Sequence, residues 1–242
     1  MIYAFDVDGT LTPSRQTITD DFHAWFSHWI DQRHQAGDEI MLITGSDYPK
    51  TLEQLGQELL DKTDWICNSA ANQVRHQGVV VHDYEFRTPL GLLELLESFL
   101  EQSAYPERTG NHIEHRGSMI NFSVVGRNAQ GEQRIRYAEW DQTTQERSRL
   151  AAQINEHFAE MNISATVGGE TGIDITTQGL DKRQALRWIN KRTIFLGDRC
   201  DPGGNDYAIA QALETDSRFQ HQVIPVTGWQ DTWNHLKNWK KA

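Results

Sequence analysis

Cysteine is scarce in this sequence, and long apolar runs are missing. Cys67 and Cys200 are the two cysteines among 242 residues, and they form no Cys-x-x-Cys spacing. A disulfide framework and a structural zinc site are therefore not expected, and a reducing cytoplasm is the simplest setting. No apolar run approaches the roughly 20 residues that span a bilayer, and the N-terminus has no basic region typical of a signal peptide. We expect a cytoplasmic protein that does not enter the membrane.

A surplus of positive charge is also absent. The chain has 23 lysines and arginines against 34 aspartates and glutamates, which gives a formal net charge of −11. Proteins that bind nucleic acid or anionic lipid usually carry a basic surface. We therefore expect neither nucleic acid nor membrane as a partner, and a small anionic substrate would need positive charge gathered locally. The ten histidines contain no His-Glu-x-x-His pattern, so they predict no metal site.

The most informative feature that is present is a pair of carboxylates near the N-terminus. Asp6 and Asp8 follow the apolar run 1–5 and precede Gly9, where the backbone must turn. Alternate residues of a strand point to the same side, so both carboxylates can face one site, where a divalent cation would relieve their repulsion. A calcium loop is excluded because its twelfth position is Thr17 rather than Glu. The segment predicts a carboxylate nucleophile, a neighbouring acid/base and a Mg²⁺ site, with an ordinary Asp-Gly turn as the alternative.

The order of expected elements divides the chain into two domains. Apolar strands alternate with amphipathic helices in the first part, which is typical of a parallel α/β sheet, and the same rhythm resumes at the end. The middle instead combines helices with antiparallel hairpins. We predict a Rossmann-like α/β core with a parallel sheet, formed by residues 1–82 and 181–242, and an inserted α+β cap domain at 83–180. The expected cap elements are helices at 90–100 and 145–161 and strands at 112–115, 119–125, 164–167 and 173–176, and a helix at 181–190 follows them.

Polar residues that suit phosphoryl transfer lie where these core strands end. Ligands of open α/β sheets gather at the carboxyl ends of the strands. Asp6 follows the first strand, Ser46 follows the second, and Asp198 follows the strand at 193–196. Lys182 opens the helix before Asp198. A carboxylate nucleophile that forms an aspartyl-phosphate needs a metal ion for charge, a lysine for the phosphoryl oxygens and small donors to orient them.

The same residues carry a resemblance to a known superfamily. Asp6-x-Asp8-Gly9-Thr10, then Thr44 or Ser46, then Lys182, then Gly197-Asp198 with Gly204-Asn205-Asp206 appear in order. This series resembles the four motifs of the haloacid dehalogenase phosphotransferases. The position of the inserted domain is similar to the class with an α/β C2 cap.

A narrower resemblance extends over most of the chain. The stretches 5–16 and 113–127 are similar to the eukaryotic-type α-phosphomannomutases, as are Gly168-Gly169, 181–183 and 202–206. The resemblance implies that Asp6 is the nucleophile, Asp8 the acid/base and Lys182 the residue that steadies the aspartyl-phosphate. It implies that Mg²⁺ is held by Asp6, the backbone carbonyl of Asp8 and Asp198. The implied substrate-binding residues are Arg15, Ser46, Arg116, Met119, Asn121, Arg127, Arg134, Gly172 and Asp174.

The implied activity interconverts mannose 6-phosphate and mannose 1-phosphate, as in GDP-mannose biosynthesis, with a hexose 1,6-bisphosphate as activator. Three cap arginines, Arg116, Arg127 and Arg134, fall on expected hairpin segments and would bind the distal phosphate through bidentate contacts. The alternatives are a sugar-phosphate phosphatase built on the same site and a non-catalytic sugar-phosphate sensor. Similar enzymes pair through their caps, so a homodimer is expected.

The chain also departs from the family pattern at several positions. Gly172 stands where the family has a serine, Val124 replaces a proline, and 68–71 replaces a Pro-Glu-Asn-Gly segment. A Phe-x-Asp-Pro pattern linked with a second cation is lost after Asp206. None of these changes removes a catalytic group, but they concern the residues that select the sugar.

Overall fold

The computed structural model describes residues 1–239, which form two compact units. One unit consists of Met1–Asp83 together with the chain from Leu180 onward, and the other is Tyr84–Gly179. These divisions lie one residue inside the expected cap at each end. Within residues 1–239, no helix is both long enough and apolar enough to cross a bilayer.

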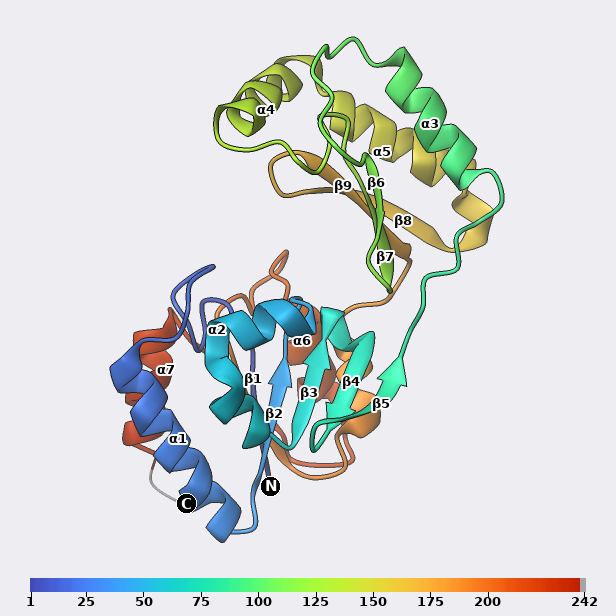
Figure 1. Cartoon of the computed structure of the whole chain (residues 1–242). Helices are drawn as coiled ribbons and strands as arrows, with labels where there is room; N and C mark the ends of the chain where they lie inside the picture. The colour runs from blue at the N-terminus through green and yellow to red at the C-terminus, as the bar shows by residue number, and fades with distance from the viewer. Residues whose placement is uncertain (240–242) are drawn as a thin grey trace. The chain divides into compact units, whose positions relative to one another are not determined.

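The first unit is built on a seven-stranded sheet with the order β11-β10-β1-β2-β3-β4-β5. Figure 1 shows β1 to β5 side by side in this order. The five strands from β11 to β3 pair in parallel, and β4 and β5 are antiparallel additions at one edge. The strands are β1 (Ile2–Phe5), β2 (Glu39–Ile43), β3 (Trp65–Asn68), β4 (Gln73–His76), β5 (Val79–Asp83), β10 (Thr193–Gly197) and β11 (Gln222–Pro225).

Both faces of this sheet are covered, because the central strand β1 is apolar and buried at every position. Tyr3 and Phe5 of β1 pack in a cluster with residues of α1, α2 and α7, whereas Ile2 and Ala4 pack in a second cluster with α6 and a 3-10 helix. Alternate residues of one strand thus serve opposite faces, which gives a helix–sheet–helix sandwich. The helices are α1 (Asp20–Gln35), α2 (Tyr48–Asp61), α6 (Tyr207–Thr215), α7 (Trp229–Lys237) and the 3-10 helix Lys182–Trp188, which occupies the expected helix at 181–190.

The second unit has a four-stranded antiparallel sheet with the order β6-β7-β9-β8. Its helices share one apolar cluster with the sheet, in which Ile120 and Phe122 of β7 and Ile173 and Ile175 of β9 take part. The residues between them, such as Asn121 and Asp174, therefore lie on the opposite, polar face. The elements are α3 (Leu92–Gln102), β6 (Ile113–His115), β7 (Met119–Phe122), α4 (Glu132–Thr144), α5 (Glu146–His157), β8 (Ile163–Gly168) and β9 (Gly172–Thr177).

The helices of this unit were only partly predicted from the sequence. The helix expected at 145–161 is α5, which ends at His157, and α4 before it was not expected at all. Two residues of α4, Tyr137 and Asp141, are buried. A helix with so small a buried face lacks the apolar periodicity by which a sequence reveals helices.

A strained turn after β3 offers a test of backbone energetics. Ser69, Ala70 and Ala71 have φ values of 49°, 58° and 66°, which is the left-handed region. Ala70 is held there because its N–H donates to Thr44 O (2.9 Å) and its carbonyl accepts from Gln184 Nε2 (3.0 Å).

We expect Ala70→Gly to raise the free energy of unfolding by about 0.5–1 kcal/mol, since relief of the left-handed strain (about 1–2 kcal/mol) exceeds the entropy that glycine gains in the unfolded chain. Urea denaturation measures the change. Ala36→Gly, at an exposed position with φ of −85°, is the matched control and should not stabilise. A lower urea midpoint for Ala70→Gly than for the wild type would show that the left-handed backbone at Ala70 is not strained.

Candidate active site

A buried lysine joins two carboxylates at the carboxyl end of the parallel sheet. Lys182 Nζ lies 2.6 Å from Asp6 Oδ1 and 2.6 Å from Asp206 Oδ1. All three side chains are at most 2% exposed. Asp6 directly follows β1, Lys182 begins its 3-10 helix, and Asp206 directly precedes α6. The fold thus brings together groups 176 residues apart in the sequence.

Burial sets the electrostatics of this triad. Burial, together with the charge of the nearby Asp206, raises the pKa of Asp6 to about 7, against the opposing effect of the Lys182 ammonium. Burial by itself would lower the pKa of Lys182, but the two carboxylates outweigh it and the pKa is raised. Lys182 is therefore a permanent cation, and Asp6 is the carboxylate whose charge is costly at neutral pH.

Asp198 adds a third carboxylate. Asp6 and Asp198 follow the adjacent parallel strands β1 and β10, and the Asp6 N–H donates to Leu196 O (3.0 Å). Burial, followed by the charge of Asp206, raises the pKa of Asp198. Gly9 has a φ of 87°, and a Cβ on it would come within 2.4 Å of Asp198 Oδ2. Glycine is thus required at this turn for two reasons: the backbone is left-handed, and Asp198 occupies the space that a side chain would need.

The donor set fits a hard divalent cation. Asp6, Asp198 and Asp206 each offer an oxygen, and these three atoms lie within 4.8 Å of one another. Asp6 Oδ2 and Asp198 Oδ1 are buried without a hydrogen-bond partner among residues 1–239. Unpartnered carboxylate oxygens in a buried site are what a cation with oxygen ligands would satisfy. Asp206 was not among the predicted ligands, although it belongs to the Gly204-Asn205-Asp206 motif.

The carboxylate of Asp8 is engaged elsewhere. Its Oδ1 accepts hydrogen bonds from the backbone N–H of Arg15 and from Gln54 Nε2, the latter at 3.0 Å. It does not belong to the three-carboxylate group, so the expected role of Asp8 in metal binding rests on its backbone carbonyl. Arg15 is exposed with a φ of 59°, and Ser46 lies between β2 and α2, where its N–H donates to Thr44 Oγ1 (3.1 Å).

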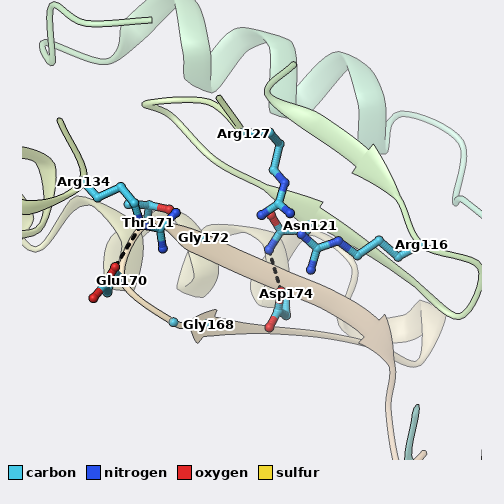
Figure 2. Close-up of a pocket in the computed structure, with 10 residues that line it drawn as sticks. Arg116, Asn121, Arg127, Arg134, Gly168, Glu170, Thr171, Gly172 and Asp174 are labelled. Atoms are coloured by element: carbon cyan, nitrogen blue, oxygen red, sulfur yellow. Dashed lines mark hydrogen bonds and ion pairs between the residues drawn. The ribbon is translucent and has the colours of Figure 1, made fainter. Parts of the chain in front are cut away.

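The second unit contains a separate polar pocket of about 150 Å³ on the open face of its sheet (Figure 2). Asn121 of β7 and Asp174 of β9 are direct cross-strand neighbours, and Asn121 Nδ2 donates to Asp174 Oδ1 (2.6 Å). A Cβ on Gly172 would lie 2.6 Å from Asn121 Nδ2, so the absence of a side chain at 172 leaves room for this amide. The lining residues are Arg116, Asn121, Arg127, Arg134, Gly168, Gly169, Glu170, Thr171, Gly172 and Asp174.

Three arginines face this pocket, and each pairs with a glutamate. Arg116 Nε and Arg127 Nε lie 2.5 Å and 2.9 Å from the same Glu114 carboxylate oxygen, and Arg134 Nε lies 2.9 Å from Glu170 Oε2. The arginine side chains keep 33–38% of their surface exposed, so their remaining N–H groups are accessible to an anion.

One expectation from the sequence was wrong. Arg134 does not lie on a hairpin, because it belongs to the first turns of α4, the helix that its sequence did not reveal. Met119 begins β7 and is not among the residues that line the pocket, so its role in substrate binding stays a prediction.

Comparison with known proteins decides the family. The family model described as "Eukaryotic phosphomannomutase" matches residues 29–241. The chain belongs to the eukaryotic phosphomannomutase family. The phosphomannomutase of Drosophila melanogaster is 31% identical over 222 residues, which cover 86% of this chain and 85% of the relative. That of Saccharomyces cerevisiae is 31% identical over 215 residues, which cover 85% and 83%.

Several solved structures have a fold similar to that of this chain. A haloacid dehalogenase-like hydrolase from Bacteroides thetaiotaomicron has a TM-score of 0.57 at 13% identity, covering 87% of this chain and 85% of its own. The Aspergillus fumigatus trehalose-6-phosphate phosphatase has a TM-score of 0.54 at 15% identity, covering 98% and 90%. The resemblance to the phosphomannomutases is confirmed by the family model, and the fold is similar to that of a haloacid dehalogenase-like hydrolase.

In this member of the phosphomannomutase family, Glu170 competes for a pocket arginine. We expect Glu170→Gln to lower KM for a hexose phosphate about two- to fivefold with little change in kcat, because an exposed ion pair of modest strength no longer occupies Arg134. Steady-state kinetics at low salt measures the change. Glu160→Gln, an exposed glutamate of the same unit outside the pocket, is the control. An unchanged or higher KM would show that Glu170 instead holds Arg134 in place.

Proposed function

We propose that this protein is a phosphohexomutase that interconverts mannose 6-phosphate and mannose 1-phosphate through a phosphorylated Asp6 and a hexose 1,6-bisphosphate. The observation that carries the proposal is the three-arginine pocket, present in addition to the buried Asp6–Lys182 pair. A mutase must bind a sugar that bears phosphate at either end, whereas hydrolysis needs one phosphate site. Arginine offers the bidentate contacts that suit the second phosphate.

The chemistry assigns a role to each core residue. A carboxylate oxygen of Asp6 attacks phosphorus, the bond from phosphorus to the sugar oxygen breaks, and Asp8 gives its proton to that leaving oxygen. In the opposite step the free hydroxyl of a hexose monophosphate gives its proton to Asp8 and takes the phosphoryl group from Asp6, which forms the 1,6-bisphosphate. Transfer of the phosphate at the other end of this bisphosphate back to Asp6 then releases the isomeric monophosphate. Lys182, already 2.6 Å from Asp6 Oδ1, supplies fixed positive charge during both transfers.

Mg²⁺ is the cofactor that we infer for the site of Asp6, Asp198 and Asp206. When bound, it would neutralise charge on the transferred phosphoryl group and on the three carboxylates. Hexose 1,6-bisphosphate would be the activator, because it can phosphorylate Asp6 without an external phosphate donor.

The competing function is a sugar-phosphate phosphatase, in which water takes the place of the second sugar hydroxyl. One assay separates the two. The protein is mixed with mannose 1-phosphate, Mg²⁺ and a trace of glucose 1,6-bisphosphate, and mannose 6-phosphate and free phosphate are followed together. The mutase produces mannose 6-phosphate with little free phosphate. Release of phosphate without isomerisation would overturn the proposal.

The inferred metal site has a test that does not depend on activity. At a Mg²⁺ concentration about 100 times Kd, binding to the folded state alone adds about 2.7 kcal/mol, which should raise Tm by roughly 5–10 °C. The comparison is made in NaCl of equal ionic strength. Asp198→Asn should remove most of the increase, and an equal increase in that variant would contradict the assigned ligands.

The remaining expectations concern partners and location. A small phosphorylated sugar is the proposed substrate, and a homodimer formed through the cap unit is the proposed assembly, with the cytoplasm as the location. A net charge of −11 supports the expectation that neither nucleic acid nor membrane is a partner. Sedimentation of the intact chain and of the isolated 84–179 segment would test the dimer, which requires that both associate.

A further inference from the structure

A buried glutamine on α2 is bonded to the loop that carries Asp8. Gln54 is 1% exposed, and its Nε2 lies 3.0 Å from Asp8 Oδ1, 3.2 Å from Thr12 Oγ1 and 3.3 Å from Gln16 O. The hydroxyl of Thr12 donates its own hydrogen to Val7 O (3.4 Å), so it is an acceptor toward Gln54. All three neighbours are therefore acceptors, which fixes the amide nitrogen on the side of the loop.

The backbone of Gln54 holds the other end of the same loop. Gly56 has a φ of 76° and interrupts α2, which leaves the Gln54 carbonyl without its usual helical partner. This carbonyl accepts instead from the Ile18 N–H (2.8 Å). One residue thus contacts the loop at Asp8 and at Ile18, with the exposed Arg15 between them.

Stability does not explain why this buried residue is polar. Gln54 Oε1 is buried with no hydrogen-bond partner among residues 1–239. A buried amide oxygen without a partner is unfavourable compared with an apolar side chain of similar size. Of the other buried residues of α2, Leu55, Leu59 and Leu60 are apolar, and the hydroxyl of Thr51 donates to Asp47 O (2.9 Å). The amide instead provides a hydrogen bond to the Asp8 carboxylate.

We propose that Gln54 is a positioning residue for Asp8. Its N–H holds Asp8 Oδ1, together with the Arg15 backbone N–H, so that Oδ2 is the oxygen that exchanges a proton with the sugar. This inference rests on the proposed function, in which Asp8 is the acid/base. Asp8 is half-buried on a loop, and a misplacement of about 1 Å can slow a reaction about 100-fold.

Two phosphate donors with different leaving groups can distinguish a positioning role of Gln54 from a purely structural one. A sugar oxygen is a poor leaving group and needs a proton from Asp8, whereas nitrophenolate leaves without one. The experiment therefore measures the single-turnover rate at which Asp6 is phosphorylated by glucose 1,6-bisphosphate and by p-nitrophenyl phosphate, using quenched samples and intact-protein mass. Both donors use the same nucleophile and the same Lys182.

Gln54→Met keeps the length of the side chain and removes the N–H. We expect it to slow phosphorylation by the bisphosphate about 100-fold, within the usual contribution of a general acid, and phosphorylation by the aryl donor less than threefold. Gln54→Leu, which also lacks the donor, should show the same selectivity and serves if the methionine variant folds poorly. Asp8→Asn should reproduce the pattern. Thr12→Val, which removes a hydroxyl that is bonded to Gln54 and Val7 but not to the Asp8 carboxylate, should leave the ratio of the two rates unchanged.

The outcomes distinguish this inference from the proposed function. Equal slowing with both donors, or no slowing with either, in the Gln54 variants would overturn the positioning role even if the wild type is a mutase. A wild type that phosphorylates Asp6 but makes no mannose 6-phosphate would overturn the mutase while leaving the comparison of donors valid.

Discussion

Asp6→Asn should lower the turnover of sugar phosphate by a factor on the order of 10⁴ or more, because an amide oxygen cannot replace a carboxylate nucleophile. The fold should survive, since burial raises the pKa of Asp6 to about 7 and its charge is costly to the folded state near neutral pH. Lys182 would keep its second partner, Asp206, at 2.6 Å. The measurements are the rate of mannose 6-phosphate formation and a thermal melt of the same sample.

The control for Asp6→Asn is Asp61→Asn, an equal change of charge at an exposed position near the end of α2. It should leave the rate unaltered. Intact-protein mass after incubation with the bisphosphate should show a phosphoryl adduct on the control and none on Asp6→Asn. Retained turnover in Asp6→Asn, with a cooperative melt, would refute Asp6 as the nucleophile.

Lys182→Met should have the largest effect on stability. The substitution leaves Asp6 and Asp206 buried without the cation that both contact. Breaking a buried ion pair in this way costs about 3–5 kcal/mol, and we expect about 3 kcal/mol because Asp6 can take up a proton instead. Activity should be lost as well, since no other cation contacts Asp6 among the described ion pairs. Chemical denaturation without Mg²⁺ measures the change in the free energy of unfolding without any contribution from metal binding.

Two further measurements identify the cause of that loss. The folded variant takes up protons on carboxyls that have lost their cation, so its deficit relative to wild type should be smaller at pH 5 than at pH 8. The double variant Lys182→Met/Asp206→Asn should recover part of the deficit because it buries one charge fewer. A deficit independent of pH and unrelieved in the double variant would indicate lost packing of the lysine stem instead.

The sequence was most informative where chemistry and periodicity coincide. Asp6, Lys182 and Asp198 could be found because each stands at the boundary of an element that apolar residues predict, and the order of these boundaries implies one edge of a sheet. The parallel strands themselves were visible as short apolar runs, since both of their faces are covered. The fold class and these core positions therefore follow from local pattern plus topology.

Other features depend on contacts that no local pattern encodes. Asp206 is one of several acidic residues in a polar loop, and its selection as a partner of Lys182 is a consequence of tertiary folding. From the sequence alone, Gln54 is an ordinary polar residue of an amphipathic helix. Its role becomes visible only through its three hydrogen bonds to the loop of residues 8–16. Arg134 was assigned to the correct pocket but to the wrong element, because α4 has a small buried face.

The strand order of the first unit also bears on how the chain is made. β1 is central, and its neighbour β10 is synthesised after the whole segment Tyr84–Gly179, which is continuous and has its own apolar core. Domains generally fold as units during synthesis, so the inserted unit can fold first. Until β10 is made, the edge of β1 that pairs with it stays unpaired. Asp6 is synthesised before the inserted segment, yet its contacts with Lys182 and Asp206 can form only after that segment has been made. The earliest part of the active site to be made is therefore among the last to be assembled.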